Sequence, residues 1–244
     1  MGLFDRFKKG ECEVCGKEIG ALGKRKIGDG YICKDCANKL SPYYTGRKRS
    51  SIEDIKRQLE YREANKADVA AFQVSRTLGL DEKVMIDEAG GTFVVVRGGR
   101  GWRDANPDVI PLSQVTGAQV DFDESRSEET YTDDDGHRQS YRPPRYTYSY
   151  RSEVVVSVNN PWFDGFTIDV TSGSTSMPHS LESEQARSAA QEICDALTEE
   201  RERAHDAAVE AAKPKTAMTC PHCGATSIPD ANGCCEYCGG AMTA

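Results

Sequence analysis

Residues 12–36, CEVCGKEIGALGKRKIGDGYICKDC, decide the fold at the N-terminal end of this chain. The stretch holds Cys12, Cys15, Cys33 and Cys36 in the spacing C-x2-C-x17-C-x2-C. Two turn-held pairs with this spacing bring four thiolates to one tetrahedral zinc ion. The second pair opens the segment CKDCANKL, which favours a helix whose positive dipole end stabilises thiolates. We therefore predict a zinc site with these four ligands. A redox dithiol pair and two disulfides are the alternatives.

A second cysteine quartet lies near the other end, in residues 220–240, CPHCGATSIPDANGCCEYCGG. Its predicted ligands, in the spacing C-x2-C-x11-C-x2-C, are Cys220, Cys223, Cys235 and Cys238. The segment closely resembles a zinc ribbon. Cys234 is surplus, and we expect a small packed side chain there, with replacement of Cys235 as the alternative. His222 lies between two ligands and is expected to point outward.

Both modules are too short to bury a sizeable core, at about 35 and 25 residues. Structural zinc contributes on the order of 10–16 kcal/mol to the folding of such peptides. Four cysteine ligands also leave no coordination position open for water or substrate. We therefore expect two structural Zn²⁺ ions per chain.

Charge and composition restrict the class of protein. The 244 residues carry a formal net charge of -8, but residues 1–66 hold 16 Lys/Arg against 10 Asp/Glu, whereas residues 67–198 hold 11 against 22. No stretch approaches the roughly 20 apolar residues that span a bilayer, and the start of the chain does not look like a signal peptide. We expect a cytoplasmic protein of bacterial type, whose ten cysteines are kept reduced.

The middle of the chain changes from helical to strand-like periodicity. Ser50 or Ser51 is expected to cap a helix that runs to about residue 66 or on to residue 72. A later helix, from about Ser180 to Ala212, carries an apolar stripe at Ala186, Ala190, Ile193 and Leu197. Between the two helices, runs rich in Val, Ile, Thr and Tyr predict antiparallel strands at residues 83–87, 92–97, 117–123, 146–158 and 166–171.

These patterns predict an α+β chain with metal-binding modules at both ends. The expected domains are an N-terminal zinc-binding module at 1–49, a helical connector at 50–72, a β-rich core with a closing helix at 73–212, and a linker and zinc ribbon at 213–244. Asp135-Gly136 and the segment GGRG at 98–101 read as a hairpin turn and a loop, because both tolerate positive φ.

The segment from Cys12 to Pro42 resembles a bacterial module known as domain of unknown function 4428. Its arrangement is similar to a treble-clef finger. The resemblance also extends to helix 52–72 and to the stretch NPDVIPLSQVTG at 106–117. It implies architecture and the ligand role of the first four cysteines, and it implies no activity. Residues 72–198, strands followed by a closing helix, resemble the element order of bacterial pleckstrin-homology-like proteins.

All the recognisable chemistry is structural, which predicts a non-enzymatic adaptor whose partner is another protein. Candidate contact features are the second half of the long helix, Trp102 in its glycine-rich loop, and the row Tyr146, Tyr148 and Tyr150. For the tyrosines, core or cross-strand packing is the alternative. Four histidines, at 137, 179, 205 and 222, show no partnered nucleophile, and no small-molecule substrate is evident.

Nucleic-acid binding through the N-terminal module is the alternative function. The candidate phosphate contacts are Lys24, Arg25, Lys26, Arg47, Lys48 and Arg49. The acidic remainder of the chain argues against it, and against binding to an anionic membrane surface. The acidic residues between 121 and 135 are expected to form a charged hairpin tip, with calcium binding as the alternative. Oxidation of zinc-bound thiolates would make the sites redox-responsive.

Overall fold

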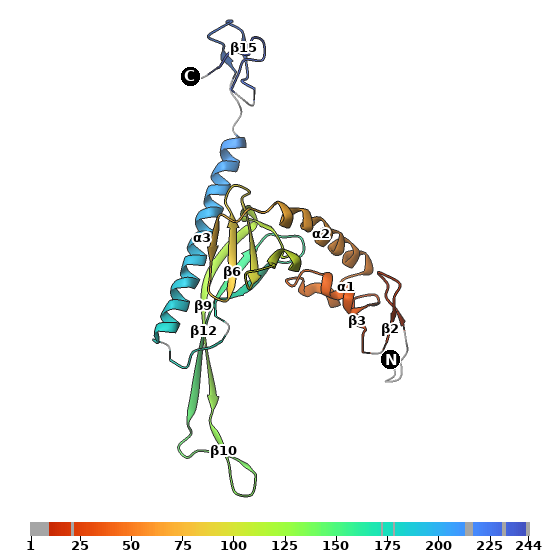
Figure 1. Ribbon diagram of the computed structural model, residues 1–244, viewed down its shortest axis with the longest axis vertical. Helices are drawn as coiled ribbons and strands as arrows, with labels where there is room; N and C mark the ends of the chain where they lie inside the picture. Colours follow the sequence, from red (N-terminus) through yellow and green to blue (C-terminus); the bar gives the residue numbers. More distant parts are fainter. Residues whose placement is uncertain are drawn as a thin grey trace. The chain divides into compact units, whose positions relative to one another are not determined.

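The computed structural model, drawn as a ribbon in Figure 1, describes residues 10–20, 22–171, 173–177, 179–212, 217–230 and 233–242. The chain forms two compact units, Met1–Glu202 and Arg203–Ala244. The first nine residues of the predicted N-terminal module and residues 213–216 of the predicted linker lie outside the described part.

The N-terminal module consists of two small hairpins and a short helix. Strand β1 (Gly10–Glu11) pairs with β2 (Glu18–Ile19), and β3 (Arg25–Lys26) pairs with β4 (Tyr31–Ile32), both antiparallel. Helix α1 (Lys34–Lys39) follows directly. The apolar side chains of this module that are at most 6% exposed are Ile19, Ile27, Ile32 and Leu40. Such a small apolar core needs another source of stability.

A connecting helix follows the module. After a 3-10 turn, η2 (Thr45–Lys48), helix α2 runs from Ile52 to Ala71. Ser51 caps it as predicted: its hydroxyl accepts from the Asp54 N–H, and the Asp54 carboxylate accepts from the Ser51 N–H. This reciprocal pair is a capping box, which satisfies two backbone donors at the helix start.

The central region contains two antiparallel sheets. The first has the order β5-β6-β7-β8, with β5 (Arg76–Leu78), β6 (Glu82–Asp87), β7 (Thr92–Arg97) and β8 (Ile110–Pro111). The second has the order β13-β12-β9, with β9 (Val115–Glu128), β12 (Tyr146–Val158) and β13 (Gly165–Asp169). Two 3-10 turns, η3 (Trp102–Ala105) and η4 (Leu112–Gln114), interrupt the connections around β8.

Strands β9 and β12 continue past the rest of their sheet as a two-stranded ribbon (Figure 1). The ribbon leads to a small hairpin of β10 (Thr130–Thr132) and β11 (Arg138–Ser140). Gly136 has a φ of 82° in the turn, so the predicted Asp135-Gly136 hairpin turn is confirmed. Tyr150 stacks on Phe122 of the paired strand at 5.7 Å, whereas Tyr146 and Tyr148 are 40% and 37% exposed.

Helix α3 (Leu181–Ala212) closes the fold. The Ser180 hydroxyl accepts from the Ser183 N–H at 3.2 Å, which matches the predicted cap. All four residues of the predicted apolar stripe, Ala186, Ala190, Ile193 and Leu197, are at most 2% exposed. The predicted exposed second half begins later than expected, because Glu200 is 5% exposed whereas Glu202 and Arg203 are exposed. Antiparallel sheets followed by one long helix confirm the α+β class.

The C-terminal unit contains one small hairpin, of β14 (Met218–Thr219) and β15 (Thr226–Ser227). Cys220, Cys235 and Met242 form its buried cluster, with Met218 packed against them. As in the N-terminal module, the apolar core is small and the cysteines are part of it.

The prediction that Trp102 is an exposed contact residue is wrong. Its ring is only 9% exposed and packs edge-on against Phe72 with ring centroids 5.8 Å apart. Gly101 has a φ of 74°, which turns the glycine-rich loop into η3 and directs the indole inward. The Arg103 guanidinium covers the ring, 4.4 Å from its centroid. Trp102 is therefore a core residue.

Candidate metal centres

The four N-terminal cysteines converge on one point. The Sγ atoms of Cys12 and Cys36 are 3.8 Å apart, as are those of Cys15 and Cys33, and all four lie within 4.8 Å of one another. These distances far exceed the roughly 2.05 Å of a disulfide bond. A zinc ion held at about 2.3 Å by four sulfurs at the corners of a tetrahedron needs sulfur–sulfur edges of about 3.8 Å. The donor set therefore fits a tetrahedral zinc ion.

Local backbone geometry places each pair of sulfurs. Gly16, with a φ of 70°, follows the first pair, and its N–H donates to the Cys12 carbonyl at 2.8 Å. This tight turn directs both side chains of the pair to the same side. The second pair begins α1, where Cys33 is the N-cap residue and its sulfur accepts from the Cys36 N–H at 3.3 Å. The Cys33 N–H in turn donates to the Cys12 sulfur at 3.2 Å.

The hydrogen bonds bias the thiols toward metal binding. Burial raises the pKa of Cys12, but three backbone N–H groups aimed at its sulfur lower it more, and the pKa falls to about 6. Burial and hydrogen bonds to the neighbouring thiols raise the pKa of Cys36. Several thiolates this close repel one another, so full deprotonation requires a cation among them.

The C-terminal quartet has the same construction. Cys220 and Cys238 have sulfurs 3.6 Å apart, and Cys223 and Cys235 have sulfurs 3.7 Å apart. All four lie within 4.8 Å of one another. The N–H groups of two positive-φ glycines, Gly224 and Gly239, donate to the carbonyls of Cys220 and Cys235 at 2.9 and 2.8 Å. Backbone hydrogen bonds from Cys238 and Tyr237 lower the pKa of Cys235 to about 6.

Cys235 joins this cluster and Cys234 does not. Cys234 is half-buried, bridges to Ala241, and its N–H donates to the Asp230 carboxylate at 2.8 Å. His222 is exposed, as predicted, although its N–H donates to the Cys220 sulfur at 3.4 Å. The remaining cysteine, Cys194, lies buried on α3, where burial raises its thiol pKa to about 11 and disfavours the thiolate form.

The comparison with protein families concerns the first cluster. Residues 11–58 match the family model described as Domain of unknown function (DUF4428). The predicted resemblance of the four-cysteine segment is therefore confirmed, while its extension to residues 59–72 and 106–117 stays a prediction. The DUF4428 match includes the N-terminal cysteines and the first part of α2, and it stops before both sheets. Neither the curated proteins nor the solved structures gave a match, so the likeness of the core to pleckstrin-homology-like proteins stays a prediction.

The DUF4428 module is attached to the core through a buried ionic network that the sequence analysis missed. The Arg62 guanidinium of α2 binds the Asp108 carboxylate at 2.7 Å, with side chains 8% and 0% exposed. Ser41, which follows α1, donates its hydroxyl to the same carboxylate at 2.8 Å. Arg62 also donates to the carbonyls of Lys39 and Asn106. Burial raises the pKa of Asp108, and Arg62 and Ser41 partly offset that effect.

The sequence does carry a signal for this network. Gln58, Arg62, Asn65 and Val69 are all buried and recur at i, i+4, i+7 and i+11. The apolar stripe of α3 has the same spacing. Because three of the four α2 residues are polar, a search for apolar periodicity passes over them.

An aromatic side chain of the module also enters the core. The Tyr43 ring stacks on Phe166 with centroids 4.2 Å apart and meets the edge of Phe163 at 5.3 Å. Burial raises the pKa of the Tyr43 hydroxyl. Charged and aromatic contacts together hold the module to the two sheets.

The two predicted basic runs meet on the module surface. The Arg47 guanidinium donates to the Lys26 carbonyl at 2.7 Å, which places residues 45–49 beside strand β3. Lys26, Lys48 and Arg49 are exposed, while Lys24, Arg25 and Arg47 are half-buried. Lys24 Nζ lies 5.4 Å from the centroid of the Tyr31 ring. The two basic runs are therefore neighbours in the N-terminal module.

The acidic residues form the predicted hairpin tip only in part: Asp133, Asp134 and Asp135 lie in the turn between β10 and β11, whereas those from 121 to 128 lie along strand β9. Asp133 accepts from the N–H groups of Asp135 and His137 and from the Gln139 amide, so its carboxylate holds the turn. These hydrogen bonds lower the pKa of Asp133. Asp133, Asp135 and His137 have ligand atoms within 4.8 Å of one another, but internal hydrogen bonds explain the cluster without an ion.

Among the described residues, every helix is either too short or too polar to span a bilayer.

Proposed function

We propose that this protein is a non-enzymatic zinc-binding adaptor with two structural Zn²⁺ ions, held by Cys12, Cys15, Cys33 and Cys36 and by Cys220, Cys223, Cys235 and Cys238. The observation that carries the proposal is the pair of four-sulfur clusters with the edge lengths of a tetrahedral zinc site. Each ion would fix peptide that has few buried apolar residues of its own.

The chemistry of the donor sets argues for a structural role. Catalytic zinc keeps one position for water or substrate, whereas four thiolates complete the coordination shell. A reducing compartment such as the cytoplasm keeps the thiols available to metal. An adaptor needs only stable surfaces, and zinc provides them at both ends of the chain.

Zinc content tests the metal sites directly. The purified chain should contain two zinc ions by elemental analysis. Cys15→Ser and Cys223→Ser should each lower that number to one, whereas the matched control Cys194→Ser should keep two. Fewer than two ions in the unaltered chain after expression in zinc-supplemented medium would contradict the proposal.

The adaptor role needs a separate experiment. Pull-downs from a lysate would compare the unaltered chain, the Cys223→Ser variant and a chain that ends at residue 212. A protein retained by the first and lost from the other two would support an adaptor that works through its C-terminal module. Identical proteins on all three would show that the ribbon presents no partner surface.

A second candidate function is nucleic-acid binding, which the contact between Arg47 and Lys26 favours because it brings two basic runs together. Counterion release predicts binding to duplex DNA that weakens as salt rises. Lys48→Glu with Arg49→Glu should abolish it, whereas Lys56→Glu, an exposed change on α2, should have a smaller effect. No binding at about 50 mM salt would rule this function out.

A further inference from the structure

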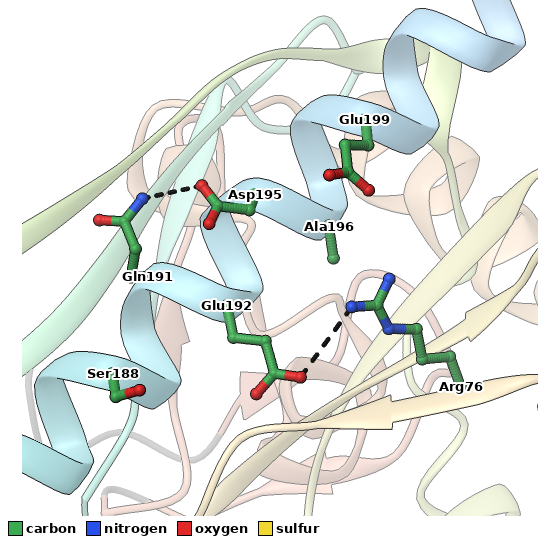
Figure 2. Close-up of a pocket in the computed structure, with 7 residues that line it drawn as sticks. All are labelled: Arg76, Ser188, Gln191, Glu192, Asp195, Ala196 and Glu199. Atoms are coloured by element: carbon green, nitrogen blue, oxygen red, sulfur yellow. Dashed lines mark hydrogen bonds and ion pairs between the residues drawn. The ribbon is translucent and has the colours of Figure 1, made fainter.

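Helix α3 and strand β5 enclose a groove of about 390 Å³, shown in Figure 2. Arg76 of β5 forms one wall. The other wall is one face of α3, made of Ser188, Gln191, Glu192, Asp195, Ala196 and Glu199. In Figure 2 the side chains of Glu192, Ala196 and Glu199 point toward Arg76 across the groove. The Glu192 carboxylate lies 3.9 Å from the Arg76 guanidinium.

Strand β5 offers an open backbone edge beside this groove. It pairs with β6 along one side, and within the described residues no strand pairs with its other side. Such an edge presents unpaired N–H and C=O groups, which is a template for an additional strand. Helix α3 lies close to the end of β5, because a Cβ atom on Gly79, the residue after β5, would be 3.5 Å from the Ile193 side chain.

The charge of the groove selects the kind of strand. Glu192, Asp195 and Glu199 give the lining three carboxylates, and Arg76 gives it one guanidinium. Glu192 and Glu199 face Arg76, whereas the Asp195 carboxylate accepts from the Gln191 amide at 2.8 Å. The carboxylates therefore outnumber the guanidinium, and a segment that carries Lys or Arg matches the sign of this lining.

We infer that this groove binds a basic, extended segment of a partner protein, which adds to the open edge of β5 as a fifth strand of that sheet, beside α3. The inference rests on the adaptor function proposed above, because it names the chemistry of the partner. Main-chain hydrogen bonds to β5 supply affinity, and the α3 carboxylates supply preference for Lys and Arg. The site lies outside both cysteine clusters, so it does not involve the metal ligands.

The first test uses the zinc-loaded full chain and a fluorescein-labelled heptapeptide of alternating lysine and valine, followed by fluorescence anisotropy at low salt. Saturable binding is expected, with none for the glutamate counterpart of the peptide. Glu192→Gln with Glu199→Gln should weaken binding about fivefold or more, as expected for the loss of two partly exposed ion pairs. The control Glu60→Gln, exposed on α2, should leave binding unchanged.

A second pair of peptides separates strand addition from simple charge attraction. One peptide is N-methylated at every lysine and the other at every valine. Because an added strand directs alternate N–H groups to its neighbour, one isomer should lose binding and the other should keep it. Equal binding of the two isomers, or no binding of the unmethylated peptide, overturns the inference.

A second copy of this chain is the competing occupant, through its own basic segment at Lys24, Arg25 and Lys26, of which the last two form strand β3. A dimer detected by analytical ultracentrifugation that disappears when these three residues are changed to glutamate, together with no peptide binding, would also overturn the inference.

Zinc content is measured on the same samples. Two ions per chain without peptide binding would refute the groove and leave the metal sites intact, whereas missing zinc would refute the metal sites independently.

Discussion

Neutralising Asp108 should destabilise the first compact unit strongly. The Asp108→Asn change keeps the size of the side chain and removes its charge, so the Arg62 guanidinium stays buried without a counterion. The Arg62 side chain is only 8% exposed, so water cannot replace the lost partner. Leaving one member of a buried ion pair alone costs about 3–5 kcal/mol. Arg62 keeps its hydrogen bonds to two carbonyls, which places the expected loss near the lower end of that range.

Urea unfolding of the zinc-loaded chain at pH 7 measures this loss. Trp102 and Trp162 both lie in the first unit, so tryptophan fluorescence follows its transition. A loss of about 3 kcal/mol with an m-value of about 2 kcal/mol/M lowers the midpoint by about 1.5 M urea. The matched control is Glu63→Gln on the same helix, which breaks the exposed pair with Lys66 and should change stability by less than about 1 kcal/mol.

The double variant Arg62→Met with Asp108→Asn provides the decisive comparison. Without either charge there is no uncompensated ion, so the double variant should lose at least about 1 kcal/mol less than the two single variants added together. If Asp108→Asn loses no more than the Glu63→Gln control, or if the two single losses simply add, the network does not hold the module in the way described here.

Three further predictions concern the core and the clusters. Ile193→Ala, at a fully buried position of α3, should lower the free energy of unfolding by about 2–5 kcal/mol in the same urea assay, and a loss under about 1 kcal/mol would contradict the packing of α3. Cys235→Ser should reduce the zinc content to one ion per chain while Cys234→Ser keeps two, and the reverse result would exchange the ligand assignment. Lowering the pH should release zinc, because protons compete with the metal for the thiolates: binding is favourable above the thiol pKa and becomes unfavourable as the pH falls through it. Without metal the pKa of Cys12 and that of Cys235 are lowered to about 6, so elemental analysis after desalting should show full zinc retention at pH 7 and loss only below about pH 6. Loss of zinc already at pH 7 would contradict this prediction.

The features that the sequence predicts well are those with local causes. The spacing of the two quartets, each pair followed by a glycine, is enough to indicate converging sulfurs. Ser51 before Glu53 and Asp54 marks a helix start, and the apolar stripe of α3 marks the face that is buried. In each case the interacting groups lie within a turn or two of one another along the chain.

The features that it misses depend on residues far apart. Asp108 meets Arg62 across 46 positions and Ser41 across 67, and a charged residue in a polar sequence gives no sign that it is buried. The burial of Trp102 is missed for a related reason. The glycines beside it indicate an exposed loop, while Phe72, the residue that packs against it, lies at the end of α2. The groove beside β5 likewise depends on a strand and a helix more than 100 residues apart.

The position of Tyr43 bears on whether the N-terminal module could be transferred to another protein by itself. The stretch that matches DUF4428 contains Tyr43 but neither Phe166 nor Phe163, so the side chains that pack on the Tyr43 ring belong to a later part of the chain. If residues 11–58 alone were moved into another protein, the Tyr43 ring would lose the phenylalanine rings that pack on it here. The segment 11–58 therefore contains all four zinc ligands of its site but not the surface that covers its aromatic ring.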